Sequence, residues 1–290
     1  MSFQRRLASG KFVVLAEMNT PKGVNVSELV ANSRRIKGRV DAVIIPDMDN
    51  GVMRMSALAG GALIHQQGME AMIHVYCRDR NRMALQGDIL AAHMLGIQTL
   101  IVVPGEEIAN GDHRDATEVG DIDELELIGA IRSLQDGVDM AGFSLNGSPE
   151  FTIGCTLGAF ADDRSLDAEL EKLEKKVAAG AGFIVTPPVF DVDHFSDCLT
   201  KIASLDVPVI ASVFLLKSVG IARYMALNEP GAHISEEMIK RIRKAPDREI
   251  ECLRIAGETT AALKQLVQGV KLETLGWEHK LPTILGFAGL

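Results

Sequence analysis

The amino-acid sequence predicts an α/β protein folded as a single (β/α)8 TIM barrel. Eight short apolar runs rich in β-branched residues recur along the chain, and amphipathic segments of helical periodicity separate them. Alternating strands and helices imply parallel strands joined by right-handed crossovers, and eight such units in 290 residues match a closed barrel. An open doubly wound sheet is the alternative, but no G-x-G-x-x-G follows the first run, and eight units exceed what one nucleotide-binding sheet needs.

The predicted strands are, in chain order, FVVLAE (12–17), DAVIIP (41–46), AMIHVY (71–76), QTLIVVP (98–104), EFTIGC (150–155), GFIVTP (182–187), PVIASVF (208–214) and LVQGVKLE (266–273). The last is the least regular, because Gly269 interrupts it. The predicted helices are 26–37, 55–67, 82–95, 124–135, 166–179, 193–203 and 235–265. Asn81, Ser165 and Ser235 are predicted N-caps, since their side chains can accept hydrogen bonds from free backbone N–H groups. No linker or low-complexity tract divides the chain, so residues 1–290 are predicted to form one domain.

Composition disfavours several classes of function. The net charge is −9 and no basic cluster is evident, which argues against a nucleic-acid partner. No apolar run approaches the roughly 20 residues that a membrane span needs, and the first apolar run lacks a cleavage site, so a cytoplasmic protein is expected. The four cysteines lie far apart with no C-x-x-C pair, which disfavours a zinc site or a disulfide framework. Small-molecule chemistry is the remaining expectation.

In a (β/α)8 barrel, functional groups lie at the C-terminal ends of the strands. The residues at these predicted ends are Glu17, Asp47, His74, Tyr76, Cys77, Gly105, Glu106, Gly154, Thr186, Pro187 and Lys217. Glu17 is unusual because it ends an otherwise apolar strand. A carboxyl at the mouth of an apolar barrel is desolvated and can hold a proton, although a solvated strand-end acid remains the alternative.

These motifs, taken in order, resemble the methylenetetrahydrofolate reductase family over nearly the whole chain. The segment HVYCRDRNRMALQGDILAAHMLGIQTLIVVPGE (74–106) is similar to the family's His-Leu-Thr-Cys-Arg-Asp-Arg-Asn motif, its following helix and a strand that ends in Gly-Asp. The segment KKVAAGAGFIVTPPVFD (175–191) resembles Lys-Lys-x-x-Ala-Gly-Ala-Asp-Phe-x-x-Thr-Gln-Pro-x-Phe-Asp. Shorter similar stretches are AEMNTPKG (16–23), GDHRDATEVGDID (111–123) and FTIGC (151–155).

The resemblance implies a flavoprotein that holds FAD and reduces 5,10-methylenetetrahydrofolate to 5-methyltetrahydrofolate, with NADH or NADPH as the donor in many members. It implies that Glu17 protonates the folate, so that the five-membered ring opens to the iminium that accepts hydride. Glu106 stands where the family has an aspartate that faces the pterin and the flavin. The resemblance also implies a folate contact at Phe190, a homo-oligomer, and in some relatives an electron-transfer partner subunit.

Four further residues are implied to line the flavin site. His74 matches a histidine that lies against the flavin, and Gly105 lets backbone approach the isoalloxazine ring because no Cβ blocks contact. Lys175 and Lys176 match basic positions near the FAD phosphates. The residues alone leave other roles open: a hydrogen-bonded core histidine, a turn glycine and a solvated lysine pair on a helix. Ion pairs among residues 78–80 would tie down the loop before Asn81.

The sequence also departs from the family pattern. Pro187 replaces a folate-binding glutamine and offers no side-chain amide, and Ile221 stands at a second glutamine position. The segment CTLGAFADD (155–163) lacks the polar or aromatic residue and the proline that the family places near the flavin. Three accounts follow: a divergent reductase, a folate-binding relative with altered use of flavin or electron donor, and a non-catalytic binding subunit. The retention of acids at both Glu17 and Glu106 favours the two enzymes.

Overall fold

The computed structural model describes residues 2–229 and 231–290, and it contains a closed barrel of eight parallel strands. The strands are β1 (Val13–Glu17), β2 (Ala42–Ile45), β3 (Ala71–Tyr76), β4 (Thr99–Val103), β5 (Thr152–Thr156), β6 (Phe183–Pro188), β7 (Val209–Phe214) and β8 (Gly269–Glu273). Each strand pairs with the next, and β8 closes the ring on β1. The predicted (β/α)8 fold is therefore confirmed.

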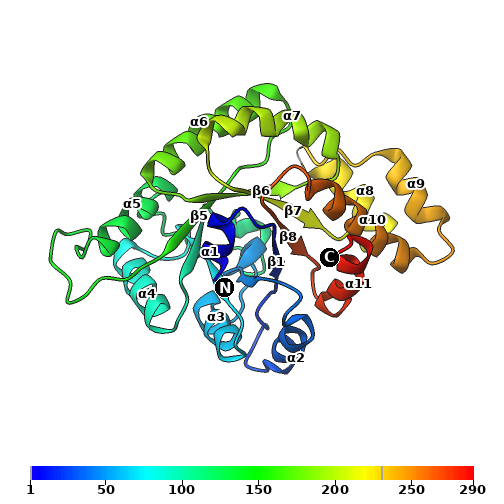
Figure 1. Ribbon diagram of the computed structural model, residues 1–290. Helices are drawn as coiled ribbons and strands as arrows, with labels where there is room; N and C mark the ends of the chain where they lie inside the picture. The colour runs from blue at the N-terminus through cyan, green and yellow to red at the C-terminus, as the bar shows by residue number, and fades with distance from the viewer. Residues whose placement is uncertain (1, 230) are drawn as a thin grey trace.

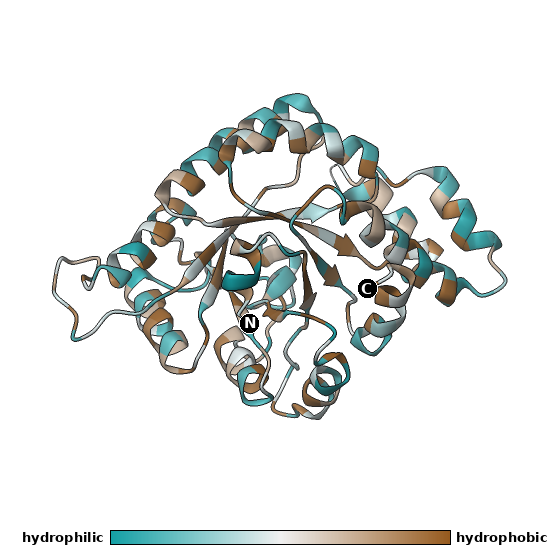
Figure 2. Ribbon diagram, in the orientation of Figure 1, coloured by the Kyte–Doolittle hydropathy of each residue, from teal (hydrophilic) through white to brown (hydrophobic). Residues whose placement is uncertain are grey.

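Helices surround the strands, as Figure 1 shows. The barrel helices are α2 (Ser27–Ile36), α3 (Ala57–Gln66), α4 (Arg82–Met94), α5 (Glu124–Gln135), α6 (Asp163–Ala179), α7 (Val192–Ile202) and α10 (Arg248–Leu263). Additional helices are α1 (Phe3–Ala8), α8 (Val219–Asn228), α9 (Glu236–Lys244) and α11 (Leu281–Phe287). Strands are mostly hydrophobic and the helices alternate between hydrophobic and hydrophilic residues, as expected for a ring of helices packed on a buried sheet (Figure 2).

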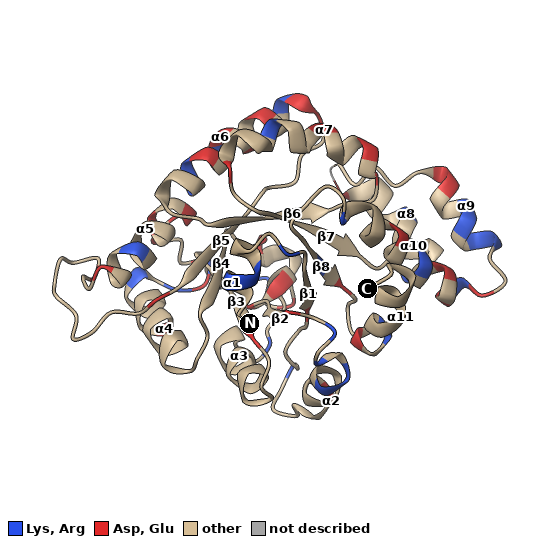
Figure 3. Cartoon of the chain, in the orientation of Figure 1, with Lys and Arg blue, Asp and Glu red and all other residues tan. Residues whose placement is uncertain are grey.

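The single helix predicted over 235–265 is wrong. Two helices occupy this segment, α9 and α10, because Pro246 has no N–H to continue α9 and forces the preceding Ala245 into an extended conformation. Most of α9 is coloured as acidic or basic residues in Figure 3, and its buried residues are Ile239 and Ile242. The sequence also failed to predict α8, which begins after Ser218.

Two of the three predicted N-caps are confirmed. Asn81 accepts a hydrogen bond from the N–H of Ala84, and Ser235 caps α9. The prediction for Ser165 is wrong, because α6 begins one turn earlier at the cap Asp162. Ser165 instead occupies the third helical position, where its hydroxyl accepts a hydrogen bond from the Asp162 N–H to complete a capping box.

Strand β8 starts at Gly269, later than predicted. A Cβ on this glycine would lie 2.3 Å from a methyl group of Val13 and 2.8 Å from one of Ile210, so the residue that interrupts the apolar pattern permits close approach by both neighbouring strands. No helix in the described ranges 2–229 and 231–290 is long and apolar enough to cross a bilayer.

Candidate active site

The barrel interior has an apolar lower half and a polar upper half. Side chains alternate along each strand, so every second residue faces inward. The lower inward residues form one buried cluster that includes Val13, Leu15, Ala42, Ile44, Met72, Ile101, Phe183, Val185 and Ile210. Phe3 and Leu7 of α1 belong to the same cluster, and the Phe3 ring packs edge-on against Phe183 at 5.2 Å between centroids. Apolar packing therefore fills the N-terminal end of the barrel and leaves the C-terminal end for chemistry.

The next inward residues are polar, and three of them form a buried ion cluster. The Lys271 Nζ lies 3.0 Å from an oxygen of Glu17 and 2.7 Å from an oxygen of Glu273. Glu17 and Lys271 are each only 8% exposed. Burial opposes the charge of Lys271, but the carboxylates of Glu17 and Glu273 outweigh it and raise the pKa of the ammonium. The Glu17 carboxyl is thus held by a fully charged lysine.

His74 lies on the same polar level of β3. Its alternating neighbour Met72 belongs to the inner cluster, and Ile73 and Val75 belong to the outer one. Burial, with a smaller contribution from the positive charge of Lys271, lowers the pKa of His74 to about 3, so the ring is neutral. Among the described residues neither ring nitrogen has a hydrogen-bond partner. The imidazole therefore retains a donor and an acceptor for a bound molecule.

We use the name acid arc for Glu17, His74, Lys271 and Glu273, which follow the barrel wall through β8, β1 and β3. The sequence pointed to Glu17 and His74 but missed Lys271 and Glu273. Their signal was a lysine and a glutamate spaced two apart in the last strand, in phase with Gly269, which places both on one face. Gly269 interrupts the apolar pattern of 266–273, and this break obscures the alternation that places Lys271 and Glu273 on the same face.

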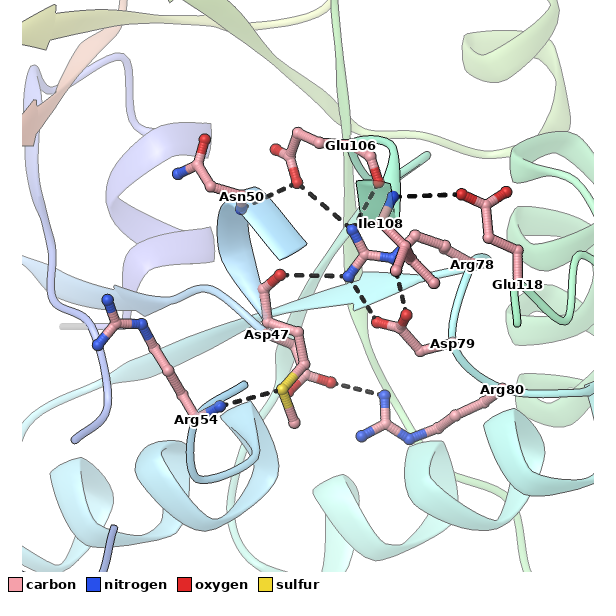
Figure 4. Close-up of polar contacts among 10 residues, drawn as sticks. Asp47, Asn50, Arg54, Arg78, Asp79, Arg80, Glu106, Ile108 and Glu118 are labelled. Carbon is pink, nitrogen blue, oxygen red and sulfur yellow. Dashed lines mark hydrogen bonds and ion pairs between the residues drawn. The ribbon is translucent and has the colours of Figure 1, made fainter. Parts of the chain in front are cut away.

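Glu106 lies in the loop after β4, and Figure 4 shows its contacts with Asn50 of the loop after β2 and with Arg78. The Asn50 N–H donates to its carboxylate at 3.2 Å, and Arg78 Nη1 donates to its backbone carbonyl at 2.6 Å. Arg78 also donates to the Met48 carbonyl at 3.2 Å, so one guanidinium connects the loops after β2 and β4. The predicted loop-tying ion pairs at residues 78–80 are present: Arg78 pairs with Asp79, and Arg80 pairs with Asp47 and Asp88.

Two glycines allow this loop arrangement. Gly105 has φ +92°, a conformation that L side chains rarely adopt, and it leaves the end of β4 without a Cβ. A Cβ on Gly111 would lie 1.9 Å from the Gly51 carbonyl oxygen, so the loop after β4 touches the loop after β2 backbone to backbone. The position of Glu106 is therefore fixed by backbone packing as well as by Arg78.

Asp49 was not singled out from the sequence. It lies in the loop after β2, beside Asn50, whose side-chain amide donates to its carboxylate at 2.8 Å. Burial, followed by the negative charges of Glu17, Glu106 and Glu273, raises the pKa of Asp49 to about 7. This loop brings a carboxyl that titrates near neutrality into the field of the acid arc.

The two predicted lysines have different environments on α6. Lys176 is buried, and its Nζ contacts a carboxylate oxygen of Glu124 at 2.6 Å and the Thr156 carbonyl at 3.1 Å. This places an ammonium beside the end of β5. Lys175 is exposed on the neighbouring face of the helix.

The adjoining part of the barrel mouth, at β6 and β7, is built differently, although Phe214 of β7 is the register partner of Glu273. We use the name apolar arc for Pro187, Pro188, Phe190 and Phe214, at the ends of β6 and β7. The two prolines cannot donate ladder hydrogen bonds, and the β6–β7 register shifts between Val185 and Pro188. Ser212 compensates, because its hydroxyl donates to the Thr186 carbonyl at 2.6 Å. The Phe190 and Phe214 rings pack edge to face at 6.4 Å between centroids.

A pocket opens beside the apolar arc, between the end of β6, the start of α7 and the end of α8. Its described lining includes Phe160, Pro187, Pro188, Phe190, His194, Phe195, Met225 and His233. Phe190 thus lies in a pocket wall, as a substrate-contacting residue requires. Ile221 is half-buried on α8 and packs against the outer core. No amide group stands at either departure from the family pattern.

His74 at the barrel mouth fits a planar flavin ring, because neither of its ring nitrogens has a partner among the described residues. Gly105 makes room for Arg78, since a Cβ there would lie 3.2 Å from the Cβ of Arg78. Lys176 provides an ammonium near β5 for a phosphate, in competition with Glu124. The described chain has no grouping of three or more His, Cys, Asp or Glu that could hold a metal ion.

Comparison with solved structures supports the fold. The chain aligns over 99% of its length with 2,3-dimethylmalate lyase, a member of the PEP mutase/isocitrate lyase superfamily, at a TM-score of 0.55, 10% identity and 83% coverage of that chain. Oxaloacetate acetylhydrolase gives a TM-score of 0.54 at 8% identity, with 99% of this chain and 83% of that chain covered. Identities this low show a shared fold alone.

Comparison with sequences is more specific. Methylenetetrahydrofolate reductase 2 of Saccharomyces cerevisiae is 27% identical over 148 residues, or 50% of this chain and 23% of the yeast protein. Methylenetetrahydrofolate reductase 1 of Schizosaccharomyces pombe is 22% identical over 152 residues, or 52% of this chain and 23% of that protein. The aligned part is therefore under a quarter of each relative. The family model for methylenetetrahydrofolate reductase matches residues 2–289, and the chain belongs to this family.

Proposed function

We propose that the chain reduces 5,10-methylenetetrahydrofolate to 5-methyltetrahydrofolate with bound FAD. The observation that carries this proposal is the placement of Glu17, a buried carboxyl held by Lys271 at the functional end of a barrel. Family membership supplies the reaction class, and the polar upper half of the barrel supplies a place for it. Because the aligned relatives are much longer than the matched stretch, the activity itself is a proposal.

Glu17 acts as the general acid. Opening the five-membered ring breaks a carbon–nitrogen bond, and the nitrogen that leaves with the electron pair needs a proton. Glu17 gives that proton, and the resulting iminium carbon accepts a hydride to become the methyl group. FAD, when bound and reduced, supplies the hydride, and NADH or NADPH restores its electrons.

Other residues bind and orient. His74 and Gly105 would border the flavin ring, and Glu106, fixed by Asn50 and Arg78, would face the flavin and the pterin. Lys176, with Lys175 beside it, attracts the FAD phosphates. Phe190 provides an aromatic wall for the folate.

A second candidate is a folate-binding relative that takes electrons in another way, for example through a partner subunit. Pro187 and Ile221 favour it, because they remove two amide groups from the substrate side. A non-catalytic binding subunit is a third candidate. The buried ammonium of Lys271 between the carboxyls of Glu17 and Glu273 speaks against this third candidate, since binding alone does not require so costly an arrangement.

The visible absorption spectrum of the purified protein tests the flavin. We expect flavin bands that NADH or NADPH bleaches and that methylenetetrahydrofolate restores. Absence of flavin bands, together with no uptake of added FAD, would contradict the flavoprotein and favour the second or third candidate. Bleaching only by another reductant would favour the second.

The substitution Glu17→Gln tests the acid. It should slow flavin reoxidation by the folate by about 10²–10⁴-fold, the usual contribution of a general acid, while flavin reduction by the donor is unchanged. Glu237→Gln, at an exposed position of α9, is the matched control. Equal losses in both half-reactions would contradict the acid role.

A further inference from the structure

We propose that Glu17, Lys271 and Glu273 work as one proton-holding unit, in which Glu273 determines whether Glu17 carries its proton. The inference rests on the proposed function, because the proton concerned is the one given to the folate. It adds two positioning residues, Lys271 and Glu273, to the general acid.

The strand register creates the unit. Glu17 and Glu273 are direct partners on β1 and β8, so their side chains emerge side by side at the top of the barrel wall. Lys271 pairs with Leu15, one inward position lower, and its ammonium reaches up to both carboxyls at 3.0 and 2.7 Å. A change in the charge of either carboxyl therefore changes the electrostatic environment of the ammonium and, through it, of the other carboxyl.

Charge balance determines the number of protons in the unit. Two carboxylates around one ammonium would leave a net negative charge in a buried place, which is costly. One proton shared between Glu17 and Glu273 makes the unit neutral. Burial, and then the neighbouring charge of Glu17, favours the protonated form of Glu273, while Lys271 opposes it, and the net effect raises the Glu273 pKa.

The surrounding elements favour the same proton. Asp49, from the loop after β2, interacts electrostatically with Glu17 and Glu273 of the unit and with Glu106 from the loop after β4. On β3, His74 is neutral, and burial followed by the charges of Asp49, Glu106 and Glu17 raises the pKa of Tyr76, so that residue is neutral too.

Two more polar groups near the unit are already engaged. The Arg78 guanidinium is held by Asp79 and the Glu106 carbonyl, and it lies 3.8 Å from the Glu106 carboxylate. On β7, the Ser212 hydroxyl donates a hydrogen bond to the Thr186 carbonyl, and its side chain also contacts Glu273, where it opposes protonation of that carboxyl. The ammonium of Lys271 is therefore the charge that balances the two carboxyls.

The chemical step follows from this arrangement. When the carbon–nitrogen bond of the folate ring breaks, its electron pair stays on nitrogen, and the proton moves from a Glu17 oxygen to that nitrogen. The unit is then left with two carboxylates around Lys271, and a proton from water restores it. If Lys271 paired with Glu17 alone, the ion pair would hold Glu17 as a carboxylate, which is a poor acid. Glu273 prevents this because it shares the ammonium with Glu17.

Two substitutions should shift the pH dependence of folate reduction in opposite directions. In Glu273→Gln, the single carboxyl that remains beside Lys271 already balances its charge without a proton, and the alkaline limb of the kcat profile should move down by about one pH unit. In Lys271→Met, the balancing charge is gone, and the same limb should move up. The pH dependence of flavin reduction by the donor should not change in either variant. Shifts in the same direction, or a slower rate with an unshifted profile, would overturn the proposal.

A second measurement needs no activity. Since the Glu273 pKa is raised in the folded protein, the wild type gains stability as the pH falls through that pKa, and Glu273→Gln lacks this gain. We expect Glu273→Gln to unfold at a higher temperature than the wild type at pH 8, with the advantage lost near pH 5. Glu237→Gln should show a constant difference. If the difference in unfolding temperature between Glu273→Gln and the wild type is the same at pH 8 and pH 5, the proton-holding unit is overturned, even if the protein reduces folate. If the difference depends on pH as expected, the unit is supported, even if the protein does not reduce folate. This measurement also stands if Lys271→Met fails to fold.

Discussion

The two sides of the barrel mouth handle polarity in opposite ways. The acid arc buries two carboxyls, an ammonium and an unpartnered imidazole within one small region. The apolar arc carries two prolines and two phenylalanines at equivalent strand ends. Within one barrel, the side that would move a proton has been kept polar, while the side that would hold the substrate relies on shape and aromatic contact.

The difference has a physical consequence for variation. The carboxyls of the acid arc are tolerated because of Lys271, so removal of that ammonium leaves them buried and uncompensated. The apolar arc is stabilised by packing, and substitutions of similar volume there cost little. We infer that substitutions in the apolar arc can change substrate binding while the residues that move the proton are retained.

The largest expected effect is on the acid arc. Lys271→Met should lower the free energy of unfolding at pH 7 by about 3–5 kcal/mol, the usual result of breaking a buried ion pair from one side. Thermal or urea unfolding measures this change. Lys240→Met, at an exposed position of α9, is the control and should stay within about 0.5 kcal/mol of the wild type. A loss for Lys271→Met as small as that of the control would contradict the buried cluster.

The next effect concerns the apolar arc. Phe190→Ala removes an aromatic wall of the pocket and should raise KM for the folate by about two- to tenfold, because one aromatic contact contributes about 0.5–1.5 kcal/mol. We expect kcat to change much less. Phe143→Ala, where the ring is 71% exposed in a loop after α5, should leave both constants unchanged. A fall in kcat with unchanged KM would assign Phe190 to the chemistry and remove the contrast between the arcs.

A smaller effect concerns the loop above the acid arc. The Asp49 pKa is raised to about 7, so the wild type gains stability as the pH falls from 8 toward 4. Asp49→Asn removes that dependence and should be more stable than the wild type at pH 8 by about 1 kcal/mol, because water screens a partly exposed carboxyl. Urea unfolding at pH 8 and at pH 5 gives the difference. Asp88→Asn, in a half-buried ion pair with Arg80, is the comparison. An unchanged pH dependence would show that Asp49 is not coupled to the arc.

The sequence predicted the fold well because alternation in a parallel barrel is a local signal. Every predicted strand is present within a few residues, since each apolar run must be buried on both faces. The segment between β7 and β8 was predicted poorly. Its helices α8 and α9 lie outside the regular strand–helix repeat, and only Pro246 marked the start of α10.

The site was harder to predict, because it depends on register between distant strands. Glu17 stood out as an acid at the end of an apolar run, but its partner Lys271 lies 254 residues away in sequence. Nothing local to Asp49 reveals that the loop after β2 packs backbone to backbone against Gly111. Strand-end acids can be found from sequence, whereas the charges that balance them require the closed barrel.

The smallest expected effect lies outside both arcs, on the neighbouring lysines of α6. Lys175 is exposed, so its ammonium is screened, and Lys175→Met should change stability by no more than about 0.5 kcal/mol and FAD affinity by less than about threefold. Lys176→Met should cost far more, because it leaves Glu124 without its ion pair and removes the ammonium beside β5. Flavin fluorescence titration and thermal unfolding of the two variants separate these outcomes. A tenfold loss of FAD affinity in Lys175→Met alone would show that the cofactor phosphates contact the exposed face of α6 and that Lys176 has a purely structural role.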